Sequence, residues 1–189
     1  MDIQEILKET NALLKGHFKL TSGRHSEYYV EKIKIIHYPD KVEMLCKEIA
    51  EKLKDYPVDV VVGPAYGGIA LAYEVAKQMG KKFVFTQRKD DQMTIRSGFD
   101  IKAGDNAVII EDIITTGGSV KEVIDVLKNY QMNVQAVSCI VDRSGGKAQF
   151  ECPLIPLTSV SFDTWEEQDC PLCKANIPIV KPGASDKKK

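Results

Sequence analysis

Short, continuous apolar runs alternate with amphipathic stretches through the middle of this chain, and this alternation most constrains its fold. The runs are VDVVVG at 58–63, KFVFTQ at 82–87, NAVIIED at 106–112 and VQAVSCIVD at 134–142. Runs of this length without polar alternation are typical of strands that are buried on both faces. Between them, apolar residues recur at helical spacing. The sequence therefore predicts strand–helix–strand units, an α/β fold with a mostly parallel central sheet flanked by helices.

The helices are predicted from one apolar face each, at 40–53, 69–79 and 120–127. Asp40 and Glu43 resemble a capping box at the start of the first. Nearer the N-terminus, a helical stripe covers 2–15, and alternation with β-branched residues predicts a strand at 28–35.

Length and composition indicate one domain, 1–189, with an α/β core at about 36–150. The first 35 residues or so, with part of 150–189, would form a small second lobe, or hood. The 26 basic and 27 acidic residues nearly cancel, which argues against nucleic-acid binding, and no apolar run is long enough to span a membrane. Five irregularly spaced cysteines fit the reducing cytoplasm.

Polar residues follow several apolar runs at the point where each predicted strand ends. They are GPAYGG at 63–68, Gln87-Arg88-Lys89, Glu111-Asp112 and Asp142-Arg143. In parallel α/β sheets the ligand crevice lies outside the carboxyl ends of the strands. Since all four groups fall at that edge, the sequence predicts a binding site there.

The stretch VIIEDIITTGGS at 108–119 carries the clearest binding chemistry. A strand that delivers Thr115 to Ser119 to a helix N-terminus offers a phosphate backbone N–H groups, a positive dipole end and hydroxyl donors. Glu111 and Asp112 would repel that phosphate and suit sugar hydroxyls or a divalent cation instead. The spacing is neither that of a P-loop nor that of G-x-G-x-x-G. A phosphorylated sugar satisfies both halves; the plain alternative is a polar strand end followed by a tight turn.

With its neighbours, this stretch resembles the 5-phosphoribosyl 1-diphosphate signature of the type I phosphoribosyltransferases, and the whole chain resembles the orotate phosphoribosyltransferases among them. The similar segments occur in the family's order and cover nearly the whole chain. They are FKLTSGRHSEYYV at 18–30, GPAYGGIALA at 63–72, RSGFDIKAGDNAVIIEDIITTGGS at 96–119, VDRSGG at 141–146 and CPLCKANIPIVKPGAS at 170–185.

The resemblance implies the type I phosphoribosyltransferase fold and a defined reaction. Orotate and 5-phosphoribosyl 1-diphosphate would give orotidine 5'-phosphate and diphosphate, in pyrimidine (UMP) biosynthesis. Displacement at the anomeric carbon has oxocarbenium-like character, so the departing diphosphate and the cationic sugar both need stabilisation. The implied cofactor is Mg2+, held mainly by the phosphoribosyl diphosphate, and no side chain is assigned as its ligand. A homodimer with shared active sites is also implied.

The resemblance further assigns roles to individual residues. Those implied in catalysis are Glu111, Asp112, Arg88 and Lys89. The phosphoribosyl diphosphate would be bound by Tyr66, Gly67, Arg88, Lys89, Glu111, Asp112, Ile113, Ile114, Thr115, Thr116, Gly117, Gly118 and Ser119. Orotate would be bound by Thr115, Arg143, Tyr28 and Tyr29, with the Arg143 guanidinium on its carboxylate. A plain alternative for the two tyrosines is packing within a core.

Three positions depart from the family pattern. Gly67 stands where many members carry a lysine in the diphosphate loop, and Gln92 replaces a lysine of their mobile loop. The common lysine of the N-terminal segment is replaced by Thr21, and Lys19, two residues earlier, would face the same side of an extended strand. Leaving-group stabilisation is therefore expected to rest on Mg2+, backbone amides, Arg88 and Lys89.

Cys170 and Cys173 have the spacing of half a zinc site, but the sequence has no second C-x-x-C. A structural metal is thus an open alternative. His17, His25 and His37 show no i, i+4 ligand spacing, and they are predicted to lie on the surface or behind the residues that contact substrate.

Two rival functions remain open on the sequence. The first is a phosphoribosyltransferase for a purine or for uracil, which Arg143 and the segment at 18–29 disfavour. The second is a transcription regulator that keeps the fold as a sensor. The near-neutral charge and the lack of length for a DNA-binding domain disfavour it.

Overall fold

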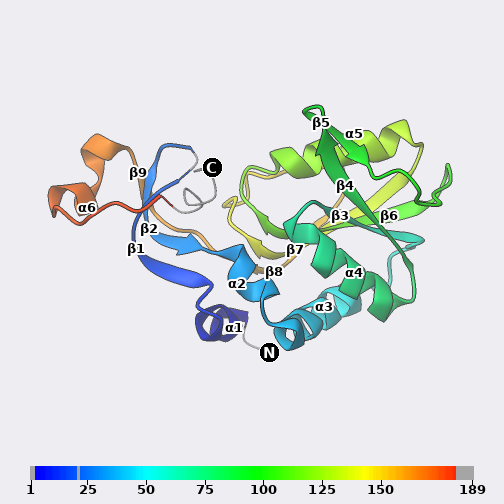
Figure 1. The fold of residues 1–189 in the computed structure, drawn as a ribbon, viewed down its shortest axis with the longest axis horizontal. Coiled ribbons are helices and arrows are strands. Elements are labelled where there is room, and N and C mark those ends of the chain that lie inside the picture. The colour runs from blue at the N-terminus through cyan, green and yellow to red at the C-terminus, as the bar shows by residue number, and fades with distance from the viewer. Residues whose placement is uncertain (1–2, 21, 182–189) are drawn as a thin grey trace. The chain divides into compact units, whose positions relative to one another are not determined.

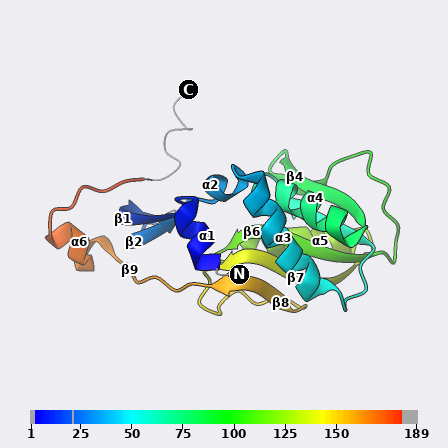
Figure 2. The ribbon, with the colours of Figure 1, turned by 90° about the horizontal axis from the view of Figure 1, so that it is seen from below.

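The computed structural model describes residues 3–20 and 22–181, and the chain divides into two compact units. One unit combines the two ends of the chain, Met1–Ile35 and Ser161–Lys189, and the other is the continuous segment Ile36–Val160. The ribbon is drawn in Figures 1 and 2. Among the described residues, no helix is both long and apolar enough to cross a membrane.

The larger unit is built on a six-stranded sheet in the order β5-β4-β3-β6-β7-β8. Its strands are β3 (Val60–Pro64), β4 (Lys82–Lys89), β5 (Gln92–Ile95), β6 (Asn106–Ile114), β7 (Asn133–Asp142) and β8 (Leu154–Ser159). Every neighbouring pair is parallel except β4 and β5. The predicted mostly parallel sheet is confirmed.

The helices of this unit are α3 (Pro39–Leu53), α4 (Gly67–Met79) and α5 (Gly118–Asn129). From the adjacent strands β3 and β6, the chain passes through α4 to β4 on one side and through α5 to β7 on the other. Because such crossovers are right-handed, α4 and α5 cover opposite faces of the sheet, as Figure 1 shows. The point between β3 and β6 is therefore a topological switch point, where α/β proteins bind ligands.

The core of this unit lies between the sheet and its helices. The predicted apolar faces are buried there, including Leu45, Ile49, Leu71 and Leu127, and the central strand residues Val60–Val62 are fully buried. Burial on both faces explains why these strands lack polar alternation.

The smaller unit contains the antiparallel sheet β1-β2-β9. Its elements are α1 (Ile3–Glu9), β1 (Leu13–Lys19), β2 (His25–Val30), α2 (Lys32–Ile36), β9 (Thr164–Trp165), a 3-10 turn (Glu167–Asp169) and α6 (Pro171–Lys174), with α2 ending one residue into the larger unit. Figure 2 shows β9 beside β2, where only His25–Trp165 and Ser26–Thr164 pair. This unit therefore joins segments from opposite ends of the chain.

Several local predictions near the N-terminus are wrong. The helical stripe at 2–15 spans two elements, because Asn11 adopts a left-handed φ of 51° that ends α1 before β1 begins. The strand expected at 28–35 ends at Val30, which pairs with Leu13, the first residue of β1. Beyond that pair β1 offers no partner, and the chain turns into α2. The predicted capping box is also absent from the described helix, because α3 begins at Pro39 without a side-chain cap.

Two strands of the large sheet were not predicted. β5 alternates polar with apolar residues over only four positions and forms a hairpin with β4 at one edge. β8 lies at the opposite edge and contains Pro156, a residue that an edge strand tolerates because one side of it needs no N–H donor. With β8 included, the larger unit runs to Val160, beyond the predicted core boundary near 150.

Candidate functional site

The predicted binding residues of the larger unit lie at the carboxyl ends of four adjacent strands, in the order β4-β3-β6-β7. Backbone hydrogen bonds join these ends. The Ala65 N–H donates to the Thr86 carbonyl at 2.8 Å, and the Arg143 N–H donates to the Ile114 carbonyl at 2.7 Å. The segments that follow the strands are therefore held side by side.

The loop after β3 packs directly against the end of β6. A Cβ atom on Gly67 would lie 1.6 Å from Asp112 Oδ2, and one on Gly68 would lie 2.7 Å from the Ile110 carbonyl oxygen. The Ala65–Tyr66 peptide bond is cis, and the Tyr66 side chain is exposed. A side chain at 67 would therefore have to displace the Asp112 carboxylate, and one at 68 would meet the backbone of β6.

Glu111 and Asp112 are both buried at the end of β6. The Asp112 N–H donates to Glu111 Oε1 at 3.0 Å, and the Ile113 N–H donates to Asp112 Oδ1 at 2.6 Å. These bonds fix the positions of two carboxyl groups at the switch point.

The turn after β6 leads into the N-terminus of α5. Gly117 has a left-handed φ of 77°, and its carbonyl accepts the hydrogen bond from the Lys121 N–H at 3.0 Å. The residues around it, Thr115, Thr116 and Ser119, are exposed. The Gly118 N–H at the start of α5 donates to Thr116 Oγ1 at 3.4 Å, and the N-cap residue Gly117 offers no side-chain cap. This arrangement suits a phosphate.

Arg88 and Lys89 end β4, at the start of a tight hairpin. Asp90 and Asp91 both have positive φ, and Lys89 pairs with Gln92 across the turn, as in a two-residue hairpin. The Arg88 guanidinium donates to both carboxylate oxygens of Glu122 on α5, at 2.7 and 2.6 Å. Gln92 thus begins strand β5. Arg88 lies beside α5, the helix that follows the turn at 115–117.

Arg143 is the first residue after β7 and is half-buried. The Asp142 carboxylate accepts a hydrogen bond from the Ser144 N–H at 2.8 Å, which fixes the turn that carries Arg143. The hydrogen bond from the Arg143 N–H to the Ile114 carbonyl places the backbone of Arg143 beside the end of β6, just before Thr115.

Tyr28 and Tyr29 belong to the smaller unit and are consecutive residues of β2. Consecutive strand residues point to opposite faces. Accordingly, Tyr28 stacks on Phe162 with ring centroids 5.2 Å apart, and Tyr29 packs against Phe18 at 5.6 Å. Lys19 forms an ion pair with Glu167 at 3.5 Å, and Thr21 lies outside the described residues.

The histidine prediction is wrong for two of the three residues. His17 and His25 are buried, and they lie together with Cys170 and Cys173. The signal in the sequence was the C-x-x-C at 170–173 together with His17 and His25. A search for i, i+4 spacing on a helix misses this combination.

Comparisons with known proteins agree with this geometry. Residues 32–168 match the phosphoribosyl transferase domain family. The chain is 47% identical to the orotate phosphoribosyltransferase of Caldicellulosiruptor bescii, over 97% of this chain and 96% of that protein. It is 49% identical to the orotate phosphoribosyltransferase of Thermoanaerobacter sp., with the same two coverages.

Among solved structures, the orotate phosphoribosyltransferase from Aeropyrum pernix is similar with a TM-score of 0.73 at 21% identity, covering 84% of this chain and 94% of that one. At that identity the likeness shows the fold. The family match and the near-full-length relatives go further: this chain belongs to the type I phosphoribosyltransferase family, in the branch of the orotate phosphoribosyltransferases.

Proposed function

We propose that this protein transfers the 5-phosphoribosyl group from 5-phosphoribosyl 1-diphosphate to orotate, in pyrimidine biosynthesis in the cytoplasm. The products are orotidine 5'-phosphate and diphosphate. The observation that carries the proposal is the meeting of a phosphate loop, a carboxylate pair and an arginine at one switch point, in a chain 47% identical over nearly its whole length to an orotate phosphoribosyltransferase.

Thr115 to Ser119 bind the 5'-phosphate in this proposal. The N–H groups at the start of α5 donate to the phosphate oxygens, and the exposed hydroxyls of Thr115, Thr116 and Ser119 add donors. Ile113 and Ile114 bring the strand to this loop. Tyr66 and Gly67, after β3, complete the phosphoribosyl diphosphate site, and Gly67 packs against Asp112.

The carboxylates of Glu111 and Asp112 face the sugar, where they bind ribose hydroxyls and offset the positive charge that develops on the ring. Mg2+ suits this donor set, because carboxylate oxygens are hard ligands. Glu111 and Asp112 would hold the ion directly or through water, with most ligands coming from the diphosphate. When bound, the ion supplies positive charge to the leaving group.

The bond between the anomeric carbon and the diphosphate oxygen breaks, and its electron pair leaves on the diphosphate. A ring nitrogen of orotate forms the new bond and gives up its proton. Arg88 and Lys89 bind the departing diphosphate in the neighbouring subunit of a homodimer. The Arg88–Glu122 pair is half-exposed, so exchanging Glu122 for a diphosphate costs only about 0–1 kcal/mol.

Arg143 selects orotate over uncharged bases. Its guanidinium can bind a carboxylate with two parallel hydrogen bonds, a group that orotate has and that uracil and purine bases lack. Thr115 lies on the neighbouring segment. Tyr28 and Tyr29 are the aromatic candidates for packing on the pyrimidine, and because they point to opposite faces of β2, one of them packs on it.

The test is turnover of orotate, followed by its ultraviolet absorbance, with Mg2+ and phosphoribosyl diphosphate. Arg143→Gln should lower kcat/KM for orotate by about 10- to 100-fold, the loss of about 1.5–3 kcal/mol of charged hydrogen bonding. It should leave the affinity for phosphoribosyl diphosphate unchanged. Lys147→Gln, an exposed change in the same turn, is the matched control and should behave as wild type.

Turnover of another base in place of orotate would overturn the substrate assignment. Binding of phosphoribosyl diphosphate without turnover of any base would favour a sensor.

A further inference from the structure

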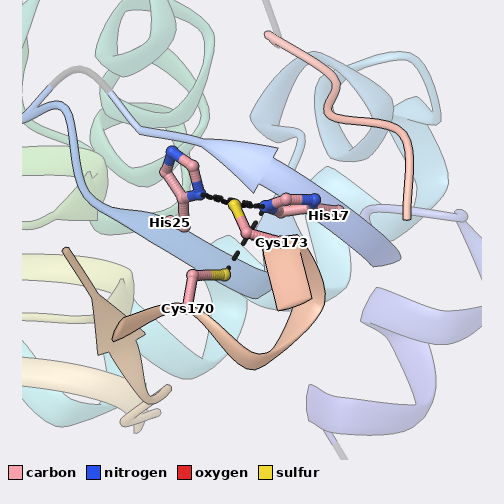
Figure 3. Close-up of side chains that lie close together, drawn as sticks. All are labelled: His17, His25, Cys170 and Cys173. Carbon is pink, nitrogen blue, oxygen red and sulfur yellow. Dashed lines mark hydrogen bonds between the residues drawn. The ribbon is translucent and has the colours of Figure 1, made fainter. Parts of the chain in front are cut away.

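Four side chains of metal-ligand type converge in the smaller unit, as Figure 3 shows. His17 comes from β1, His25 from β2, and Cys170 and Cys173 flank the start of α6. Each offers one ligand atom, and these four atoms all lie within 4.8 Å of one another. None of these residues belongs to the proposed phosphoribosyl diphosphate site, which is built from the larger unit.

We propose that His17, His25, Cys170 and Cys173 bind one Zn2+ ion in a structural Cys2His2 site that fastens the C-terminal segment to strands β1 and β2.

Four of the six distances between the ligand atoms fit a tetrahedron around zinc. With Zn–N near 2.05 Å and Zn–S near 2.3 Å, tetrahedral geometry requires separations of about 3.3 Å for N···N and 3.6 Å for N···S. His17 Nε2 lies 3.0 Å from His25 Nδ1. The sulfur atoms of Cys170 and Cys173 lie 3.6 and 3.7 Å from His17 Nε2, and Cys173 Sγ lies 3.2 Å from His25 Nδ1. Four separations thus agree with the ideal values within roughly 0.4 Å.

The tautomer of His17 is set for ligation. His17 Nδ1 lies 2.8 Å from the carbonyl oxygen of Ile177. A carbonyl only accepts hydrogen bonds, so Nδ1 carries the proton and Nε2 presents its lone pair to the cluster. A backbone carbonyl that orients a histidine in this way is a regular feature of metal sites.

Burial and charge also favour a bound ion. His17, His25 and Cys170 are buried, and Cys173 is half-buried. Two thiolates and two neutral imidazoles balance the charge of one Zn2+, so the loaded site is neutral and can be buried at little electrostatic cost. Zn2+ is the divalent ion that best matches mixed thiolate and imidazole ligands in a tetrahedron.

The pairing of β1 with β2 brings the two histidines together. His25 on β2 pairs with Lys19 on β1, and His17 lies where the pairing of β1 is irregular, between Lys15 and Phe18. The two imidazole rings meet edge to face, with centroids 4.9 Å apart.

The ion would add a buried link between the two chain segments of this unit, besides the Lys19–Glu167 ion pair and the stacking of Tyr28 on Phe162. β9 contributes only two residues to the sheet. Beyond α6, Val180 exchanges backbone hydrogen bonds with His17 and Lys19. Small units without a large core commonly depend on metals or disulfides for stability. Binding of one ion by residues from both segments closes a long loop and restricts the unfolded chain.

Metal content provides the first test, since it requires no catalytic activity. The full chain, purified without chelators from zinc-supplemented cells, should contain one zinc ion per chain. Inductively coupled plasma mass spectrometry measures this. Cys173→Ser and His25→Asn should lose the zinc. Two matched controls, Cys152→Ser and His37→Asn, change the same residue types away from the cluster and should retain it.

A second measurement uses the wild-type protein, so its result does not depend on whether the variants fold. Wild-type protein stripped of metal and loaded with Co2+ should show the intense visible bands of a tetrahedral site, with sulfur-to-cobalt charge transfer. Zn2+, but not Mg2+, should protect Cys173 from alkylation. Weak octahedral bands or an unprotected Cys173 would each overturn the proposal. So would protein that, as first purified from zinc-supplemented cells, contains no zinc and carries a Cys170–Cys173 disulfide.

Discussion

Adding one methyl group at Gly67 would drive it into the Asp112 carboxylate. The Cβ of Gly67→Ala would lie 1.6 Å from Asp112 Oδ2, whereas ordinary contacts begin near 3.4 Å. The backbone at Gly67 does not have a positive φ, and the residue is the first of α4. Alanine is therefore acceptable to the backbone itself, and the whole cost comes from the clash.

The size of the effect follows from what must move. Asp112 Oδ2 has to retreat by roughly 2 Å to reach van der Waals distance. Overpacking of this kind costs about 1–3 kcal/mol, and loss of the hydrogen bond from the Ile113 N–H to the carboxylate adds about 1.5–3 kcal/mol. Replacing glycine by alanine offsets about 0.4–1 kcal/mol of this cost, because alanine restricts the unfolded chain. We expect a net destabilisation of about 2–4 kcal/mol.

Activity should fall more steeply than stability. Displacing a positioned catalytic group by about 1 Å can cost roughly 100-fold in rate, so Gly67→Ala should lower kcat by about that factor. The measurements are urea unfolding for the free energy of unfolding and orotate turnover for kcat. Phosphoribosyl diphosphate binding can be followed separately by calorimetry.

A double-mutant cycle isolates the clash from other effects. In the Asp112→Ala background the obstructing oxygen is gone, and the Cβ of residue 112 lies at an ordinary 3.5 Å. There Gly67→Ala should be neutral or stabilising, which gives a coupling free energy of about 2–4 kcal/mol. Equal destabilisation in both backgrounds, or wild-type stability and activity of Gly67→Ala, would refute the close approach.

Two further predictions follow from titratable groups. The backbone and side-chain N–H groups of Asn106 donate to Asp59 and hold its pKa below the usual 3.8. The stability that Asp59 contributes is present above that value and lost as the pH falls through the lower folded pKa. In urea unfolding, the stability gap between wild type and Asp59→Ala should stay constant from pH 7 to 5 and shrink below about pH 4; a gap that widens in acid would contradict this. Burial raises the pKa of the Cys46 thiol to about 12 and raises that of Cys139 as well. At pH 8, alkylation should modify half-buried Cys152 before Cys46 and Cys139, which should react only after unfolding. Peptide mapping identifies the modified thiols, and early labelling of Cys46 would contradict this.

The parallel strands and flanking helices of the larger unit were predictable because their signals are local. A strand buried on both faces must be apolar throughout, and a helix on one face must carry an apolar stripe. The Thr-Gly segment at 115–119 was likewise placed between a strand and a helix from its immediate neighbours. Predictions from short segments were wrong where an element ended for a reason outside its periodicity. Strand pairing ends at Val30, and a left-handed φ at Asn11 follows the end of α1.

The sequence by itself determined the α/β class, the mostly parallel sheet and the family to which its motifs belong. The order of the strands came from the structure. Only the tertiary structure placed Gly67 against Asp112, paired Arg88 with Glu122, and brought His17 and His25 to Cys170 and Cys173. The physical reason is that periodicity within a segment records how that segment is buried. Contacts between distant segments depend on strand register and chain reversal, which no single segment encodes.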